Sequence, residues 1–364
     1  MPDNPALPRM DVGRILIVRT DRLGDVILTL PMLPVLRRRY PGAHIGMLLS
    51  TYTGEIVTGN PFVDELIWYD DGRNRLPFNA MLREIRRRRF NAVVVAHPTL
   101  RLALLMFLAR IPLRIGSGYR YYSFLFNQRV YEHRKDAKRH EVEYNLNLLR
   151  LLDCLPTDDV EFAVVVSEED RMSTEQLIRF RDMGVGDELV VLHPGSGGSA
   201  REWPPRNFAE LAGRLWNERR SKIVVTGMPG DERKGELIVS ATHGNALSLV
   251  GKLRVKQLAA LVQSADIVIA NSTGPLHIAA AVGTPVVGLY PQLTPMSAAR
   301  WGPYTSRKRV LVPDKPADCG ECSPERGQEC ACMASISVQD VYRAASELLA
   351  ESHCIDLQGE THER

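Results

Sequence analysis

An apolar run at residues 14–18 leads directly into RTDRLGD at residues 19–25, where charged side chains and one glycine separate two hydrophobic segments. A segment that only packs in a core needs no such junction. A carboxylate at a strand-to-helix turn can accept a proton from a substrate hydroxyl, and a helix start favours its ionised form. Asp25 is therefore the candidate catalytic base, and an N-cap role for its side chain is the structural alternative.

The arginines of this junction have two possible roles. Arg19 and Arg22 could contact phosphates of an acceptor, or they could only neutralise Asp21 and Asp25. Arg120, also in the first half of the chain, is a third candidate acceptor contact.

A second junction is LHPGSGGSAREWP at residues 192–204, where a strand-like run enters a glycine-rich loop. Glycines such as Gly197 let backbone N–H groups approach an anion closely, and the Ser196 hydroxyl can donate a hydrogen bond. The guanidinium of Arg201 can bind a phosphate through two hydrogen bonds. A flexible solvent loop is the alternative, which the preceding strand and the following Arg-x-Trp-Pro disfavour.

A third junction follows the run IVIAN at residues 267–271. Ser272 or Thr273 can cap the helix that begins there, and the N–H groups of Thr273 and Gly274 then form an anion site aided by the helix dipole. His277 lies about one turn further on and could reach the same anion.

The loop VVTGMPGDERKGE at residues 224–236 also follows a strand-like run. Asp231 or Glu232 could accept hydrogen bonds from ribose hydroxyls, or could simply lie at a helix N-terminus. The three loops of this half suit a nucleotide diphosphate. The chain has neither a P-loop motif nor a G-x-G-x-x-G after its first strand, which disfavours P-loop phosphoryl transfer and a dehydrogenase.

Short β-branched runs alternate with amphipathic stretches along the whole chain, which is typical of parallel α/β domains. The alternation of strands and helices begins again after residue 185, and the charged segment near 155–187 is interpreted as the link between two domains. We expect two Rossmann-like, doubly wound domains facing a central cleft, at residues 1–160 and 161–336, with ligands at the carboxyl ends of the strands. The expected strands are residues 14–18, 44–49, 65–69, 91–96 and 114–117, then 188–195, 222–227, 246–251, 267–271 and 285–290.

Composition indicates a soluble globular protein, with 45% hydrophobic and 24% charged residues. Residues 1–155 hold 24 Lys and Arg against 15 Asp and Glu, whereas residues 156–364 hold 22 against 28. The basic half suggests an anionic partner such as a phosphorylated glycolipid, a membrane surface or nucleic acid, although each run could be a solvated helix face. Neither a signal peptide nor a membrane span is visible, so we expect a cytoplasmic protein.

Three stretches together resemble glycosyltransferase family nine, the ADP-heptose:lipopolysaccharide heptosyltransferases of Gram-negative bacteria. They are LIVRTDRLGDVILTLPMLPVLRRRYP, LHPGSGGSAREWPPRNFAEL and NSTGPLHIAAAVGTPVVGLY, which occur in this order, and the resemblance extends from about residue 14 to 345. The resemblance implies the GT-B fold, with an acceptor domain, a nucleotide-sugar domain and a C-terminal helix (residues 337–352) that packs back on the first domain.

The resemblance also implies roles for individual residues. The family's Gly-Asp places the catalytic base at Asp25, and its Lys-x-Trp-Pro cation corresponds to Arg201. Lys252 and Leu253 stand where the family places the nucleobase. Ser272 stands where the family has an acid that is expected to contact the donor sugar. This replacement favours the alternative that the donor carries a sugar other than heptose.

The implied activity is inverting transfer of a heptose, or a related sugar, from an ADP-sugar to a lipopolysaccharide core or similar phosphorylated glycolipid. Such a protein would contact the inner membrane leaflet peripherally and would not bind nucleic acid. Three alternatives are a same-family transferase using another nucleotide sugar for a different surface glycan, a nucleotide-sugar epimerase of the same fold, and a non-catalytic glycan- or nucleic-acid-binding protein. The intact donor loops argue against the last.

Four of the six cysteines cluster at Cys319, Cys322, Cys330 and Cys332. Their spacing could hold a tetrahedral zinc ion, but free thiols in an irregular loop are the favoured interpretation. The transfer itself requires no metal or other cofactor.

Overall fold

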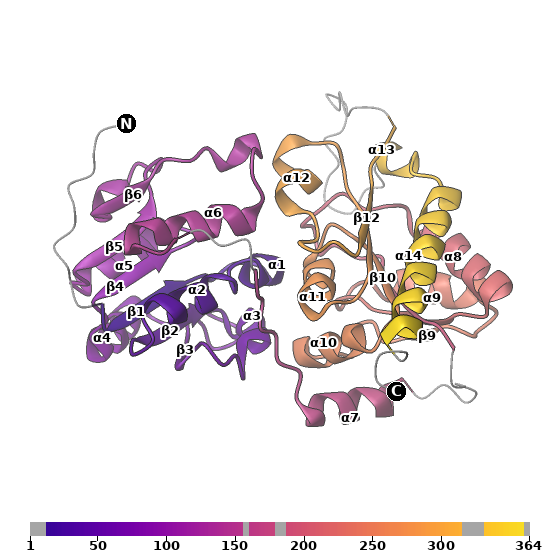
Figure 1. The fold of residues 1–364 in the computed structure, drawn as a ribbon, viewed down its shortest axis with the longest axis horizontal. Helices are drawn as coiled ribbons and strands as arrows, with labels where there is room; N and C mark the ends of the chain where they lie inside the picture. The colour runs from indigo at the N-terminus through magenta and orange to yellow at the C-terminus, as the bar shows by residue number, and fades with distance from the viewer. Residues whose placement is uncertain (1–11, 156–159, 179–186, 315–330, 360–364) are drawn as a thin grey trace. The chain divides into compact units, whose positions relative to one another are not determined.

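The computed structural model describes residues 12–155, 160–178, 187–314 and 331–359 (Figure 1). The chain divides into two compact units. The first comprises residues up to His133 together with Val142–Ala163, and the second comprises Arg134–Glu141 together with Val164 onward. The boundary thus lies three residues beyond the expected one, and a short segment of the first half belongs to the second unit.

The first unit is built on a parallel six-stranded sheet in the order β3-β2-β1-β4-β5-β6. Its strands are β1 (Arg14–Val18), β2 (His44–Leu49), β3 (Glu65–Trp68), β4 (Ala92–Val95), β5 (Leu113–Ser117) and β6 (Gln128–Val130). Its helices are α1 (Leu23–Ile27), α2 (Met32–Arg39), α3 (Thr51–Gly54), α4 (Phe78–Arg88), α5 (Leu100–Leu108) and α6 (Glu141–Leu148), the last beginning at the end of the Arg134–Glu141 segment.

The second unit repeats the same plan, with the order β12-β11-β10-β7-β8-β9. Its strands are β7 (Leu189–His193), β8 (Lys222–Val225), β9 (Leu247–Ser248), β10 (Ile267–Asn271), β11 (Val286–Leu289) and β12 (Lys308–Leu311). Its helices are α7 (Glu168–Leu177), α8 (Pro205–Arg214), α9 (Glu232–Ala241), α10 (Val255–Gln263), α11 (Gly274–Val282), α12 (Ala298–Trp301), α13 (Ala331–Ala334) and α14 (Val338–Gly359).

In each unit the chain reverses its direction of travel across the sheet next to the first strand. The reversal lies between β1 and β4 in the first unit, and between β7 and β10 in the second. Open α/β sheets bind ligands beyond the carboxyl ends of the strands at such a point. The junctions after β1, β7 and β10 therefore stand at the two positions that this fold uses for binding, and the expected Rossmann-like architecture is confirmed.

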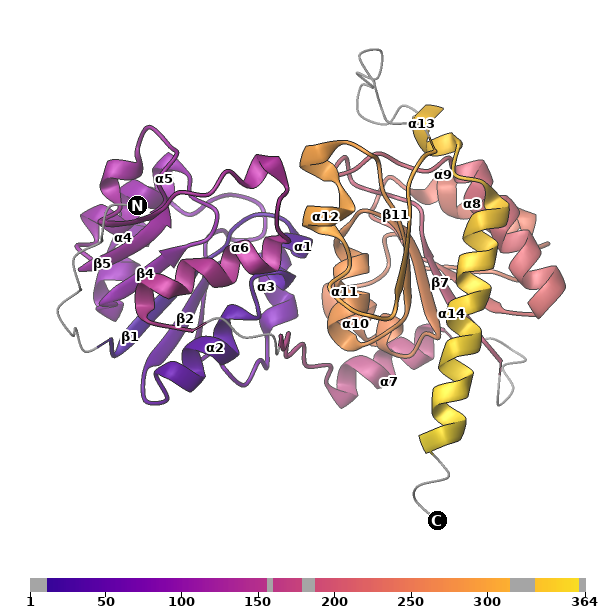
Figure 2. The same ribbon diagram turned by 45° about the horizontal axis from the view of Figure 1, so that its top comes forward.

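The expectation that the C-terminal helix packs on the first domain is wrong. Helix α14 contacts β10, β11, β12 and α8, all of the second unit, as Figures 1 and 2 show. Its residues Val341, Ala345 and Leu348 are buried in the same core as Trp203 and Phe208. The physical reason is that an apolar stripe at helical spacing covers a sheet face that would otherwise be exposed.

Candidate functional site

Asp25 lies in the first turn of α1, seven residues after the end of β1. The cap position of this helix is Arg22, and no side chain caps its start. The N-cap role considered for Asp25 is therefore not observed. Its side chain is 15% exposed, which leaves the carboxylate accessible to a small group from solvent.

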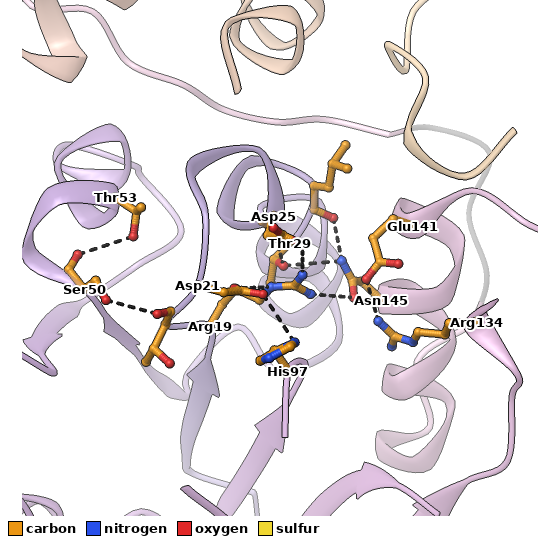
Figure 3. A network of polar contacts seen from close by, with 12 residues as sticks. Arg19, Asp21, Asp25, Thr29, Ser50, Thr53, His97, Arg134, Glu141 and Asn145 are labelled. Carbon is orange, nitrogen blue, oxygen red and sulfur yellow. Dashed lines mark hydrogen bonds and ion pairs between the residues drawn. The ribbon is translucent and has the colours of Figure 1, made fainter. Parts of the chain in front are cut away.

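Arg19 connects the acids of this junction (Figure 3). Its Nε donates to Asp21 Oδ1 at 2.7 Å, and Nη2 forms an ion pair with Asp25 Oδ1. Only 2% of its side chain is exposed, so the guanidinium faces protein groups. This geometry is that of the neutralising role, and we assign Arg19 to holding the two carboxylates rather than to acceptor phosphates.

Residues distant in sequence complete this network. Asn145 of α6 lies with its Oδ1 3.5 Å from Arg19 Nη1, and its Nδ2 donates to the Leu28 carbonyl at 2.9 Å. The Thr29 hydroxyl donates to the Asp25 carbonyl at 2.8 Å. These contacts fix the short α1, which is too short to be stable by itself.

His97 follows β4, the strand on the other side of the reversal point, and its Nδ1 lies 3.4 Å from Asp21 Oδ2. The imidazole is 45% exposed, so it can also meet a ligand. Neither Asn145 nor His97 was predicted from the sequence. A His-Pro pair directly after a strand was the available signal for His97, and nothing local marks Asn145. Arg22 and Arg120 are exposed and remain candidate acceptor contacts.

The loop after β7 turns at two adjacent glycines. Gly197 and Gly198 have φ values of +56° and +73°, which glycine adopts without strain. The Ser196 N–H donates to Glu202 Oε1 at 2.7 Å, and the Ser196 hydroxyl donates to the Ala200 carbonyl at 3.2 Å. The nearby Arg201 is half-buried. Ser196 thus shapes the loop in this state, and Gly197 is exposed at its tip.

Asn271, at the end of β10, joins this loop to the next one. Its Oδ1 accepts from the Trp203 N–H at 2.9 Å, and its Nδ2 donates to the Pro194 carbonyl at 2.7 Å. The side chain is fully buried. It therefore fixes the two loops beside the reversal point of the second unit relative to each other.

Helix α11 begins at Gly274, with Thr273 at its cap position and Pro275 in its first turn. Neither Ser272 nor Thr273 caps the helix with its side chain, so its first N–H groups have no side-chain cap. The Ser272 N–H donates to the Leu289 carbonyl at 3.2 Å, just before the buried Tyr290, whose pKa burial raises far above its ordinary value.

His277 of α11 is buried, and its Nδ1 has no hydrogen-bond partner within the part of the chain that the structure describes. Burial lowers the pKa of this imidazole to about 3, and the nearby His140 adds to the effect. His277 is thus neutral at pH 7, and an anion there would meet an imidazole dipole rather than a cation.

The acids after β8 are already engaged. Asp231 Oδ1 lies 2.7 Å from Lys234 Nζ, and Oδ2 accepts from the Met228 N–H at 3.0 Å. Glu232 is exposed and closes its turn onto the Gly230 N–H. Both lie at the start of α9, the structural alternative considered for them.

Lys234, which was not predicted from the sequence, also pairs with Glu202 at 2.8 Å and so links the start of α9 to the loop after β7. Lys252 and Leu253 follow β9 at the edge of the sheet; Lys252 is exposed and donates to the Ser248 carbonyl.

Cys319, Cys322 and Cys330 lie outside the described residues. Cys332 is half-buried against the core of the second unit. Within the described ranges, no group of three or more His, Cys, Asp or Glu residues is placed to hold a metal ion. Nor does any described helix combine the length and hydrophobicity needed to cross a bilayer.

The family model described as glycosyltransferase family 9 (heptosyltransferase) matches residues 78–332. The chain belongs to this family. It is a glycosyltransferase with the GT-B fold, as the three stretches of sequence predicted.

Individual family members agree with this assignment. Lipopolysaccharide heptosyltransferase 2 of Salmonella typhimurium is 28% identical over 319 residues, covering 82% of this chain and 87% of the relative. A family 9 glycosyltransferase structure from Veillonella parvula is 26% identical, with a TM-score of 0.81, covering 95% of this chain and 100% of that chain. The E. coli ADP-heptose lps heptosyltransferase II structure is similar in fold at 23% identity, with a TM-score of 0.75 and coverage of 93% and 99%.

Proposed function

We propose that this glycosyltransferase moves a heptose from ADP-heptose to a phosphorylated lipopolysaccharide-core acceptor, with inversion at the anomeric carbon. Family membership supports the reaction type, and the names of similar proteins support the sugar and the acceptor. The observation that carries the chemistry is Asp25, an accessible carboxylate that caps no helix and is held by Arg19 at the reversal point.

In the proposed reaction, Asp25 takes the proton of the acceptor hydroxyl as its oxygen attacks the anomeric carbon. The bond between that carbon and the diphosphate oxygen breaks, and ADP leaves with the bonding electrons. The leaving diphosphate gains negative charge, which preorganised donors stabilise. Candidates for this work are the backbone N–H of Gly197, the Arg201 guanidinium and the N–H groups at the start of α11.

The remaining candidate residues keep more limited roles in this proposal. His277 would contribute through its neutral imidazole, while Lys252 and Leu253 would contact the base. Asp231 and Glu232 could accept from ribose hydroxyls only by sharing or exchanging their present partners.

We further place the reaction at the inner face of the cell membrane, because the acceptor is a glycolipid. The excess of Lys and Arg in residues 1–155 suits a phosphorylated acceptor.

A same-family enzyme that uses another nucleotide sugar is the second candidate. Ser272 favours it, since this residue stands where the family has an acid. An epimerase would convert the donor with no acceptor present, which separates it from both transferases.

Titration calorimetry with ADP, UDP, GDP, CMP and NAD tests the donor. We expect selective binding of ADP, weakened about 10–100-fold in Arg201→Ala, because a charged hydrogen-bonding partner of the diphosphate is lost. Arg343→Ala is the matched control, since within the described ranges this exposed arginine of α14 forms an ion pair only with the neighbouring Asp340. A preference for UDP or GDP would replace ADP-heptose by another donor, and binding of no nucleotide would refute the proposal.

A further inference from the structure

Helix α5 of the first unit is apolar on both of its faces. Leu102, Leu105 and Met106 are buried in the core. Leu100, Leu104 and Phe107, spaced by four and three residues, lie on the opposite side of the helix. All three are exposed, Phe107 by 45%.

The neighbouring segment at residues 121–125 shows the same division. Tyr122 and Leu125 are buried, whereas Tyr121 is 80% and Phe124 is 69% exposed. The Tyr122 hydroxyl donates to the Pro98 carbonyl at 2.6 Å, just before α5 begins. This contact ties the start of the segment to the start of the helix.

Arg114 contacts both α5 and the segment at residues 121–125, near the ends of these two elements. Its guanidinium carbon lies 5.4 Å from the centre of the Phe107 ring, and its Nε donates to the Leu125 carbonyl at 2.9 Å. The exposed side chains of both elements therefore form one surface, here called the docking face. It consists of Leu100, Leu104, Phe107, Tyr121 and Phe124.

Positive charge surrounds the docking face. Residues 83–129 contain ten arginines, no lysine and a single acid, Glu84. Arg86 and Arg101 donate to the carbonyls of Leu108 and Leu76, and neither forms an ion pair with an acid in the described part of the chain. The remaining exposed cations of this stretch outside α4 are Arg89, Arg110, Arg120 and Arg129.

We propose that the docking face binds an anionic phospholipid bilayer. Exposed leucine and aromatic side chains enter the boundary between headgroups and acyl chains, and the surrounding arginines contact lipid phosphates. The one-sided charge selects an anionic surface over a neutral one. This inference deepens the proposed function and rests on its claim that the acceptor is lipid-borne.

The docking face also begins beside the proposed catalytic junction. Leu100 lies three residues after His97, which contacts Asp21, and Tyr121 follows the carboxyl end of β5. An acceptor held in the bilayer would thus present its headgroup near the edge of the sheet that carries Asp25.

Co-sedimentation of the full chain with vesicles tests this proposal. The vesicles are three parts phosphatidylethanolamine to one part phosphatidylglycerol, compared with pure phosphatidylcholine. We expect wild type to bind only the anionic vesicles, and binding to weaken about tenfold in Phe107→Ser/Phe124→Ser because apolar contact area is lost. Arg83 is an exposed residue of α4, the helix next to α5. Arg83→Gln/Arg110→Asn should weaken binding about fivefold for each charge removed.

Met172→Ser/Leu237→Ser is the control, since these exposed side chains lie on α7 and α9 of the second unit. Equal binding to both vesicle types, no binding, or equal losses in the control would overturn the proposal. A concentration-dependent dimer that the Phe107→Ser/Phe124→Ser change abolishes, without vesicle binding, would assign the face to a second copy instead. ADP titration of the same samples separates the claims: a protein that binds ADP but no vesicles refutes only the docking face, and the reverse refutes only the donor site.

Discussion

Arg19→Gln tests whether the buried guanidinium holds the catalytic junction together. The substitution removes the ion pairs with Asp21 and Asp25 and the contact with Asn145. Breaking a buried ion pair by removing one partner costs about 3–5 kcal/mol. Here the acids are 19% and 15% exposed and can regain some water, so we expect a loss of about 2–4 kcal/mol in the free energy of unfolding.

Urea unfolding of the variant measures this loss, and transfer kinetics report on the junction itself. Without the guanidinium, the two carboxylates repel each other, so the acidic limb of the pH–rate profile should move to higher pH. Arg19→Lys keeps the charge but cannot bridge both acids, and its stability should be intermediate. Arg22→Gln removes the same charge from an exposed position and should change stability by less than about 0.5 kcal/mol. A stable Arg19→Gln variant with an unaltered pH–rate profile would refute the reasoning.

Three further perturbations test the second unit. Asn271→Ala leaves the Trp203 N–H and the Pro194 carbonyl without their buried partner. We expect urea unfolding to show a loss of about 2–4 kcal/mol in the free energy of unfolding. A loss below about 0.5 kcal/mol would contradict the inference that Asn271 fixes the two loops relative to each other. Gly195→Ala places a Cβ 2.1 Å from Asp231 Oδ2, so the loop must shift. Calorimetry should show weaker nucleotide binding, and the free energy of unfolding should fall by about 1–3 kcal/mol. Gly42→Ala is the control and should change neither quantity, because its Cβ would meet open space. Burial lowers the pKa values of His193 and His277 to about 4 and about 3. Below about pH 6.5 the unfolded chain therefore binds more protons than the folded one. The free energy of unfolding should fall as the pH drops from about 6.5 toward 4, by up to about 1.4 kcal/mol per pH unit for each histidine. Replacing either histidine by Gln should flatten that slope, and an unchanged slope would count against its neutral burial.

Local sequence patterns predicted much of the fold. Strands β1, β2 and β10 occupy the same residues as predicted. Short β-branched and apolar runs bounded by polar turns favour a strand over a helix, because they are too short and too uniformly apolar for helical periodicity. The loops after β1, β7 and β10 were placed correctly at strand ends. Strands β6 and β12 were missed: β6 has only three residues, and both are edge strands with partly exposed side chains.

Long-range contacts explain what the sequence did not reveal. Asn145 and His97 reach the Asp25 junction from other elements, and Lys234 of α9 pairs with Glu202, 32 residues earlier in the chain. Helix α14 has an apolar stripe that fits any uncovered sheet face, and only the assembled core shows which face it covers. The burial of Arg19 also depends on long-range contacts, since an arginine judged by its residue type alone is expected to be exposed and to contact a ligand.

The central claim is that Asp25 is the base of an ADP-sugar transfer, and the most direct test is the turnover number of Asp25→Asn with ADP-heptose and a phosphorylated core acceptor. We predict a loss of about 10²–10⁴-fold in kcat, with ADP affinity unchanged in the same preparation, because only proton removal is lost. An Asp25→Asn enzyme that keeps wild-type kcat would contradict the account and move the search for the base to the neighbouring Asp21 and His97.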